Sequence, residues 1–199
     1  MKLLTLAPVV LFGALFCSTA QADTILFGSG PGLEGYASFD GSLDWNGSSL
    51  TVQLRNTTNA ALGGYLTAFA LDGPSGLSVR RYSTDNSNFG LIVDPATRPW
   101  TGYDFGASAT RGQWQGGGNP RGGLGVGESA SWKFAFTGDT SGLTAGSFLG
   151  QPLAARFRGG EGGWSDKVPS SGNPVPEPGT CVLLGLAILG VAGRRRRRT

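Results

Sequence analysis

The chain has 199 residues, of which 35 are Gly and 15% are charged, and it contains no His. This composition favours an all-β protein with many turns over a helical one, because Gly weakens helices. The two cysteines, Cys17 and Cys181, lie in apolar terminal segments. The composition therefore excludes a disulfide, a Cys or His zinc site and a His-based catalytic triad from the body between them.

The formal net charge of +3 comes from the ends of the chain. Lys2 and the five arginines of the C-terminal cluster supply six of the sixteen basic residues. Residues 23–174 hold ten basic and twelve acidic residues, which gives this part a net charge of −2. A slightly acidic body does not attract a phosphate backbone, so we expect no nucleic-acid partner.

The first 22 residues have the three parts of a secretory signal peptide. Lys2 provides the positive start, an apolar run comes next, and Ala20 and Ala22 place small residues at the two positions that a signal peptidase reads. We predict cleavage after Ala22, so that the mature chain begins at Asp23. The apolar run is shorter than a membrane span of about 20 residues, which favours cleavage over an uncut anchor.

Residues 23–167 are predicted to form an antiparallel β-sandwich of jelly-roll or immunoglobulin-like type. Apolar and polar residues alternate in several runs, as in half-buried strands, and clusters of Gly, Asn, Asp and Pro separate many of them. The expected strands are Thr24–Phe27, Tyr36–Phe39, Ser49–Asn56, Tyr65–Leu71, Leu77–Tyr82, Phe89–Val93, Ser131–Thr137 and Leu153–Arg158.

The strand pattern lapses between Pro95 and Ser129, where the chain is rich in Gly and aromatic residues. This stretch is too long for an ordinary loop, so it is partly structured, mobile or a binding surface. Trp100, Tyr103 and Trp114 suggest a glycan-binding patch, because aromatic faces stack on sugar rings. The alternative is that these rings pin a long loop to the sandwich.

Four carboxylates of the body offer the groups that a glycoside hydrolase without His or Cys requires: Asp104, Glu128, Glu161 and Asp166. Nothing in the sequence brings two of them together, so we expect surface acids and no enzyme. The segment Asp85–Asn88 lacks the alternating order of a Ca²⁺ loop, and Gly122–Ser129 lacks the Lys and the subsequent helix of a phosphate loop. We therefore expect neither a metal nor a cofactor.

The last part of the chain has three features that do not suit a packed domain. Residues 168–174 are a Pro/Ser/Gly linker, which is expected to hold the C-terminal tail clear of the body. Residues 180–192 are all apolar or small, and as a helix they would be about 20 Å long against a bilayer core of about 30 Å. The signal peptide and this short transmembrane helix together place the body across the membrane.

A cluster of five arginines comes directly before the last residue of the chain. Such a cluster would stop transfer through the membrane and stay cytoplasmic, because charged side chains cross a bilayer only at high cost. The predicted stop-transfer residues are Arg194, Arg195, Arg196, Arg197 and Arg198.

Val175, Pro176, Glu177 and Pro178, with the apolar segment and the arginine cluster after them, resemble the PEP-CTERM sorting signal of exported proteins in Gram-negative bacteria that make exopolysaccharide. The resemblance implies recognition of Pro-Glu-Pro by an exosortase, transient anchoring in the inner membrane, and release to the cell surface or extracellular matrix. We expect a structural or adhesive role, with exopolysaccharide as a candidate partner. The alternatives are a carbohydrate-active hydrolase that uses acidic residues and a periplasmic domain kept on its tail anchor without sorting.

Overall fold

The computed structural model describes residues 23–109, 113–115, 118–171 and 175–176. The predicted signal peptide with Ala20 and Ala22 and the predicted transmembrane helix lie outside these residues. The same holds for the predicted stop-transfer cluster, which consists of Arg194, Arg195, Arg196, Arg197 and Arg198. The helices of the described part are short 3-10 turns, η1 (Pro120–Gly122), η2 (Ala145–Phe148) and η3 (Glu161–Gly163). None of the described helices has the length and apolar character that a membrane span requires.

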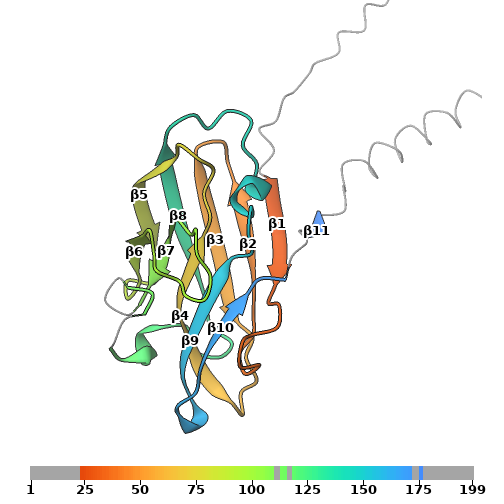
Figure 1. Cartoon of the computed structure of the whole chain (residues 1–199), viewed down its shortest axis with the longest axis vertical. Helices are drawn as coiled ribbons and strands as arrows, with labels where there is room; N and C mark the ends of the chain where they lie inside the picture. The colour runs from red at the N-terminus through yellow and green to blue at the C-terminus, as the bar shows by residue number, and fades with distance from the viewer. Residues whose placement is uncertain (1–22, 110–112, 116–117, 172–174, 177–199) are drawn as a thin grey trace, which may run out of the picture.

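The described strands form two sheets in which neighbouring strands are antiparallel (Figure 1). The six-stranded sheet has the order β11-β1-β2-β3-β8-β5, and the five-stranded sheet has the order β10-β9-β4-β7-β6. The strands are β1 (Asp23–Gly28), β2 (Phe39–Trp45), β3 (Ser49–Asn56), β4 (Gly63–Leu71), β5 (Ser78–Thr84), β6 (Gly90–Val93), β7 (Phe105–Ser108), β8 (Ser129–Thr137), β9 (Ala154–Gly160), β10 (Ser165–Pro169) and β11 (Val175–Pro176). The predicted all-β, antiparallel fold is confirmed.

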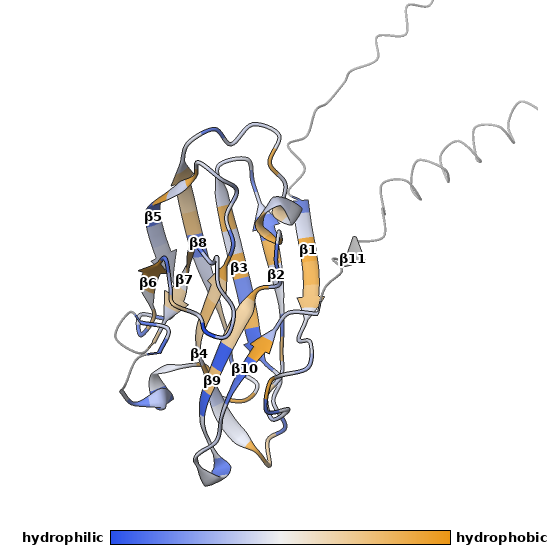
Figure 2. Cartoon of the chain, in the orientation of Figure 1, coloured by the Kyte–Doolittle hydropathy of each residue, from blue (hydrophilic) through white to orange (hydrophobic). Residues whose placement is uncertain are grey.

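The core lies between the two sheets and is built from alternate residues of the strands. Leu50, Val52 and Leu54 of β3 are buried, whereas Gln53 and Arg55 are exposed. Along the strands, apolar residues are interspersed with polar ones (Figure 2). Aromatic rings join the sheets: the ring centroids of Phe69 and Trp132 are 4.7 Å apart, and those of Phe105 and Phe134 are 4.9 Å apart. Burial of large apolar side chains is the main term that stabilises such a sandwich.

The predicted strands agree with the structure where the alternation is strong. β3 has the predicted bounds, and β1, β4, β5, β6, β8 and β9 overlap the predicted ranges. The prediction of a strand at Tyr36–Phe39 is wrong except for Phe39, where β2 begins. The pattern also misses β7 and β10. Gly41 interrupts the apolar alternation of β2, and β7 has a single large apolar residue, because neighbouring atoms leave no room for a Cβ at Gly41 or Gly106.

The segment predicted to be a linker is in part a strand of the domain. β10 includes Val168 and Pro169, and the Val168 side chain is fully buried. Ser170 is also buried, and its Oγ accepts a hydrogen bond from the N–H of Leu153 over 3.0 Å. A linker that holds the tail clear of the body therefore does not begin at residue 168.

The outer face of the five-stranded sheet is covered by the segment that comes after β6. Ala68 and Ala70 of β4, Ala154 of β9 and Ile92 of β6 form a second buried cluster with the rings of this segment. The small alanine side chains leave room for large rings to pack against the sheet. The stretch between Pro95 and Ser129 is thus partly structured, because it contributes β7, η1 and this cover.

Candidate functional site

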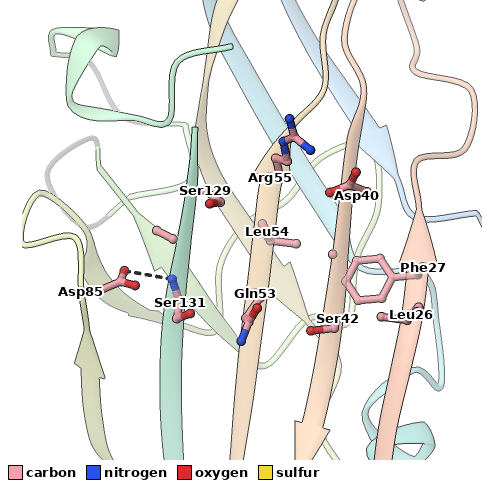
Figure 3. Close-up of a pocket in the computed structure, with 12 residues that line it drawn as sticks. Leu26, Phe27, Asp40, Ser42, Gln53, Leu54, Arg55, Asp85, Ser129 and Ser131 are labelled. Atoms are coloured by element: carbon pink, nitrogen blue, oxygen red, sulfur yellow. Dashed lines mark hydrogen bonds between the residues drawn. The ribbon is translucent and has the colours of Figure 1, made fainter. Parts of the chain in front are cut away.

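The outer face of the six-stranded sheet is hollowed into a groove of about 510 Å³ that crosses β1, β2, β3 and β8. We call it the open-face groove. Figure 3 shows its side chains standing on neighbouring strands, and they include Leu26, Asp40, Ser42, Gln53, Arg55, Asp85, Ser129 and Ser131. The polar side chains on the strands occupy the positions that alternate with the buried residues of the same strands. Leu26, Phe27, Leu54 and Ala130 add apolar atoms to the lining.

Strand register places the polar side chains of the groove in two rows. Asp40 of β2 is the partner of Arg55 of β3, and Arg55 is in turn the partner of Ser129 of β8. In the next row Ser42 is the partner of Gln53, and Gln53 is the partner of Ser131. Residues opposite each other in antiparallel strands have Cβ atoms about 5 Å apart. The rows therefore form a continuous set of hydrogen-bonding groups across three strands.

Asp85 closes the second row at the end of β5. Its carboxylate accepts a hydrogen bond from the N–H of Ser131 over 2.9 Å, and its own N–H donates to the Ser131 carbonyl. Asp40 and Asp85 are separated by β3 and β8, which is about 14 Å at the usual strand spacing. The carboxylates of glycoside hydrolases lie about 5–9.5 Å apart. Asp40 and Asp85 are thus farther apart than the paired carboxylates of a glycosidase.

The groove offers ligand-binding groups of several kinds and no metal centre. Arg55 presents N–H donors, Gln53 both donates and accepts, and the serine hydroxyls do the same. Among the described residues no group of three or more acidic or Cys side chains could hold a metal ion. Such a surface suits an extended, hydroxyl-rich or otherwise polar ligand.

The three residues of the predicted glycan patch, Trp100, Tyr103 and Trp114, are largely buried against the five-stranded sheet. Trp114 is 2% exposed and Tyr103 is 4% exposed, and Trp100 is half-buried against the same cluster. The Tyr103 hydroxyl donates to the carbonyl of Pro152 over 2.7 Å, and burial raises the pKa of Tyr103 to about 12. In this arrangement the Trp114 and Tyr103 rings expose little of their surface. They pin the covering segment to the five-stranded sheet, which is the alternative that the sequence left open.

The four carboxylates that the sequence singles out lie on different elements. Glu161 is exposed in η3, and Glu128 accepts a hydrogen bond from the N–H of Gly125 over 2.7 Å. Asp166 is buried and holds a loop through backbone hydrogen bonds. Asp104 lies beside Asp72, a residue that the sequence does not single out. Of the four, Glu128 and Asp166 are engaged in backbone hydrogen bonds, and Asp104 has another carboxyl, that of Asp72, beside it.

The Asp72 and Asp104 carboxyls meet at the end of β4 and the start of β7. Desolvation raises the pKa of Asp72, and its hydrogen bond and charge contact with Asp104 raise that pKa further, while the N–H of Gly73 opposes the change. The Gly73 N–H also donates to Asp104 over 2.8 Å. The two carboxyls are within hydrogen-bonding reach of each other, and this proximity adds to the desolvation that raises the pKa of Asp72.

The groove itself is not apparent in the sequence. Its residues come from strands that are far apart in the chain, because β3 pairs with β8. Alternation shows that Gln53 and Arg55 face away from the core, but it does not show which strand lies beside them. The signal that could have found them is the set of polar residues at alternate positions of β2, which are Asp40, Ser42 and Asp44.

The beginning of the sorting segment lies at the edge of the six-stranded sheet. Val175 and Pro176 form β11, whose partners on β1 are Leu26 and Ile25. Glu177 and Pro178 lie outside the described residues. The family model of the PEP-CTERM protein-sorting motif matches residues 174–198. The chain carries a PEP-CTERM sorting motif.

The PEP-CTERM motif covers the tail, and of the described β strands only β11 belongs to it. It implies export, a membrane-anchored sorting signal and processing by an exosortase. A search of the curated proteins found no match to the chain. What the β domain does must therefore be argued from its own surface.

Proposed function

We propose that this protein is an exported, exosortase-sorted component of the cell envelope or extracellular matrix, with a structural or adhesive role and no catalytic activity. In this proposal it contacts exopolysaccharide through the open-face groove. The observation that carries the proposal is the contrast between the two outer faces, since one is covered by the protein's own rings and the other is a polar groove.

The polar rows of the groove support a polysaccharide partner. Sugar hydroxyls donate and accept hydrogen bonds, and Arg55, Gln53 and Ser131 match them with donors and acceptors across neighbouring strands. Each hydrogen bond of this kind contributes about 1 kcal/mol, so binding would depend on repeated contacts along a polymer. Such weak, multivalent contact suits adhesion. The body also lacks His and Cys, which removes many catalytic mechanisms.

A polysaccharide pull-down tests this proposal with the protein released from cells. We expect Arg55→Ala to reduce retention about fivefold to tenfold, because it removes a charged donor from the centre of the first row. Gln53→Ala, which changes the second row, should reduce retention by a smaller factor. The matched control is Arg121→Ala, since Arg121 is an exposed arginine of η1 outside the groove.

The same experiment separates binding from folding and from hydrolysis. All three variants should unfold at the wild-type temperature, because the substituted side chains are exposed. Equal retention of Arg55→Ala, Gln53→Ala and wild type would contradict the groove as the contact surface. Shortening of the polysaccharide by the wild-type protein would contradict the proposed absence of catalysis.

A further inference from the structure

The free edge of β1 receives the beginning of the sorting motif. β11 pairs antiparallel with β1, with Val175 opposite Leu26 and Pro176 opposite Ile25. In the six-stranded sheet β11 lies outermost, next to β1 (Figure 1). An unpaired sheet edge is a template for another strand. Here the strand that uses it belongs to the sorting motif of the same chain.

The chain just before the motif is tied to the last residue of β1 and to the residues that come directly after it. The N–H of Gly30 donates to the carbonyl of Pro169 over 2.7 Å, and the N–H of Ser171 donates to the carbonyl of Gly28 over 2.8 Å. The Ser171 hydroxyl donates to the same carbonyl over 3.1 Å. These contacts continue from β10, so residues 169–171 run antiparallel to residues 28–30 and lead the chain to the free edge of β1.

The tether between this anchored stretch and the motif is short. Val175 comes four residues after Ser171, and four residues span at most about 14 Å when fully extended. A short tether holds the motif at an effective concentration on the order of millimolar relative to its partner strand. Val175–Pro176 therefore stay near β1, and any enzyme that binds the motif competes with an intramolecular partner.

We propose that β1 is a built-in partner strand for the sorting motif, and that the exosortase acts on chains whose Val175–Pro176 have left β1. An enzyme that grips the motif as an extended peptide needs backbone groups that the pairing with β1 occupies. Two partners that need the same groups exclude each other, so the enzyme's apparent affinity falls with the fraction of released chains. This inference rests on processing at the motif and not on polysaccharide binding.

A disulfide across the pair tests the proposal in cells. Leu26→Cys and Val175→Cys place thiols at directly opposite positions, where Cβ atoms lie about 4.5–5.5 Å apart, at the upper limit of disulfide geometry. Leu26 is 48% exposed, so its substitution leaves the core intact. Both variants are made with Cys17→Ala and Cys181→Ala, which removes every native thiol. The readout is the mass of the C-terminal peptide, with and without reductant.

We expect processing of the oxidised double variant to fall at least tenfold and to recover when the disulfide is reduced. The reference for the locked chain is the Val175→Cys single variant in the same background, which carries the same change to the motif, and the Leu26→Cys single variant controls for the change to β1. A locked chain processed as fast as the single variants would overturn the proposal. So would two cysteines that fail to bond in a folded body. A parent chain that still ends at Thr199 would overturn both this inference and the sorting step, and would leave the binding proposal standing.

Discussion

Asp166 shows how one buried carboxylate can organise a loop. Its side chain is 2% exposed and accepts hydrogen bonds from the backbone N–H groups of Glu34, Tyr36 and Ala37 over 2.9–3.2 Å. The N–H of Lys167 donates to the same carboxylate over 2.7 Å. A buried charge is tolerated when donors surround it. The Asp166 carboxylate therefore accepts the backbone hydrogen bonds of the loop before β2 that a neighbouring strand would otherwise accept.

We predict that Asp166→Asn lowers the free energy of unfolding by about 2–4 kcal/mol, because an amide NH₂ would face backbone donors and leave some unpaired. Denaturant unfolding measures the change. The control is Asp139→Asn, since Asp139 is exposed and bonds within its own turn, and it should change the midpoint little. Wild-type stability in Asp166→Asn would show that water replaces these hydrogen bonds without loss.

At the scale of the element, β7 depends on a glycine. β7 lies between β4 and β6 with all four residues buried, and a Cβ on Gly106 would come within 2.0 Å of the Phe69 carbonyl oxygen. We predict that Gly106→Ala lowers the free energy of unfolding by about 1–3 kcal/mol, because the strands must move apart. Thermal or denaturant unfolding measures it.

Gly90 is the matched control for Gly106. It lies on the neighbouring strand β6, opposite Ser108, and a Cβ there would meet nothing within 4 Å. Gly90→Ala should leave stability unchanged or raise it by up to about 1 kcal/mol, since alanine restricts the unfolded chain. Equal losses in the two variants would contradict close packing at Gly106 as the cause.

Some strands could be predicted from the sequence and others could not, and the difference lies in their side chains. Alternation fixes β3 and β8 because large apolar side chains occupy every second position. It misses β7, where backbone contact excludes a side chain, and it misplaces β2, where Gly41 interrupts the apolar face. The glycine-rich stretch before β8 also hides a bridge from Leu124 to Leu66. Local patterns do not contain such contacts between distant strands.

At the scale of the molecule, the two outer faces differ in what covers them. The sequence shows that the segment after β6 contains aromatic residues. It does not show whether their rings are exposed to a ligand or buried against the protein. The alanines of β4 and β9 decide this, because they leave space on the five-stranded sheet that Trp114 and Tyr103 fill. The corresponding face of the six-stranded sheet carries charged and polar side chains and stays hollow.

This asymmetry predicts opposite effects for Trp114→Ala and Arg55→Ala. Loss of the buried Trp114 ring should lower the free energy of unfolding by about 3 kcal/mol or more and leave polysaccharide retention unchanged at temperatures where the variant is folded. Arg55→Ala should reduce retention and leave stability unchanged. Denaturant unfolding and the pull-down are measured on the same samples. Loss of retention in folded Trp114→Ala, with full retention in Arg55→Ala, would show that the ligand contacts the face that we describe as covered.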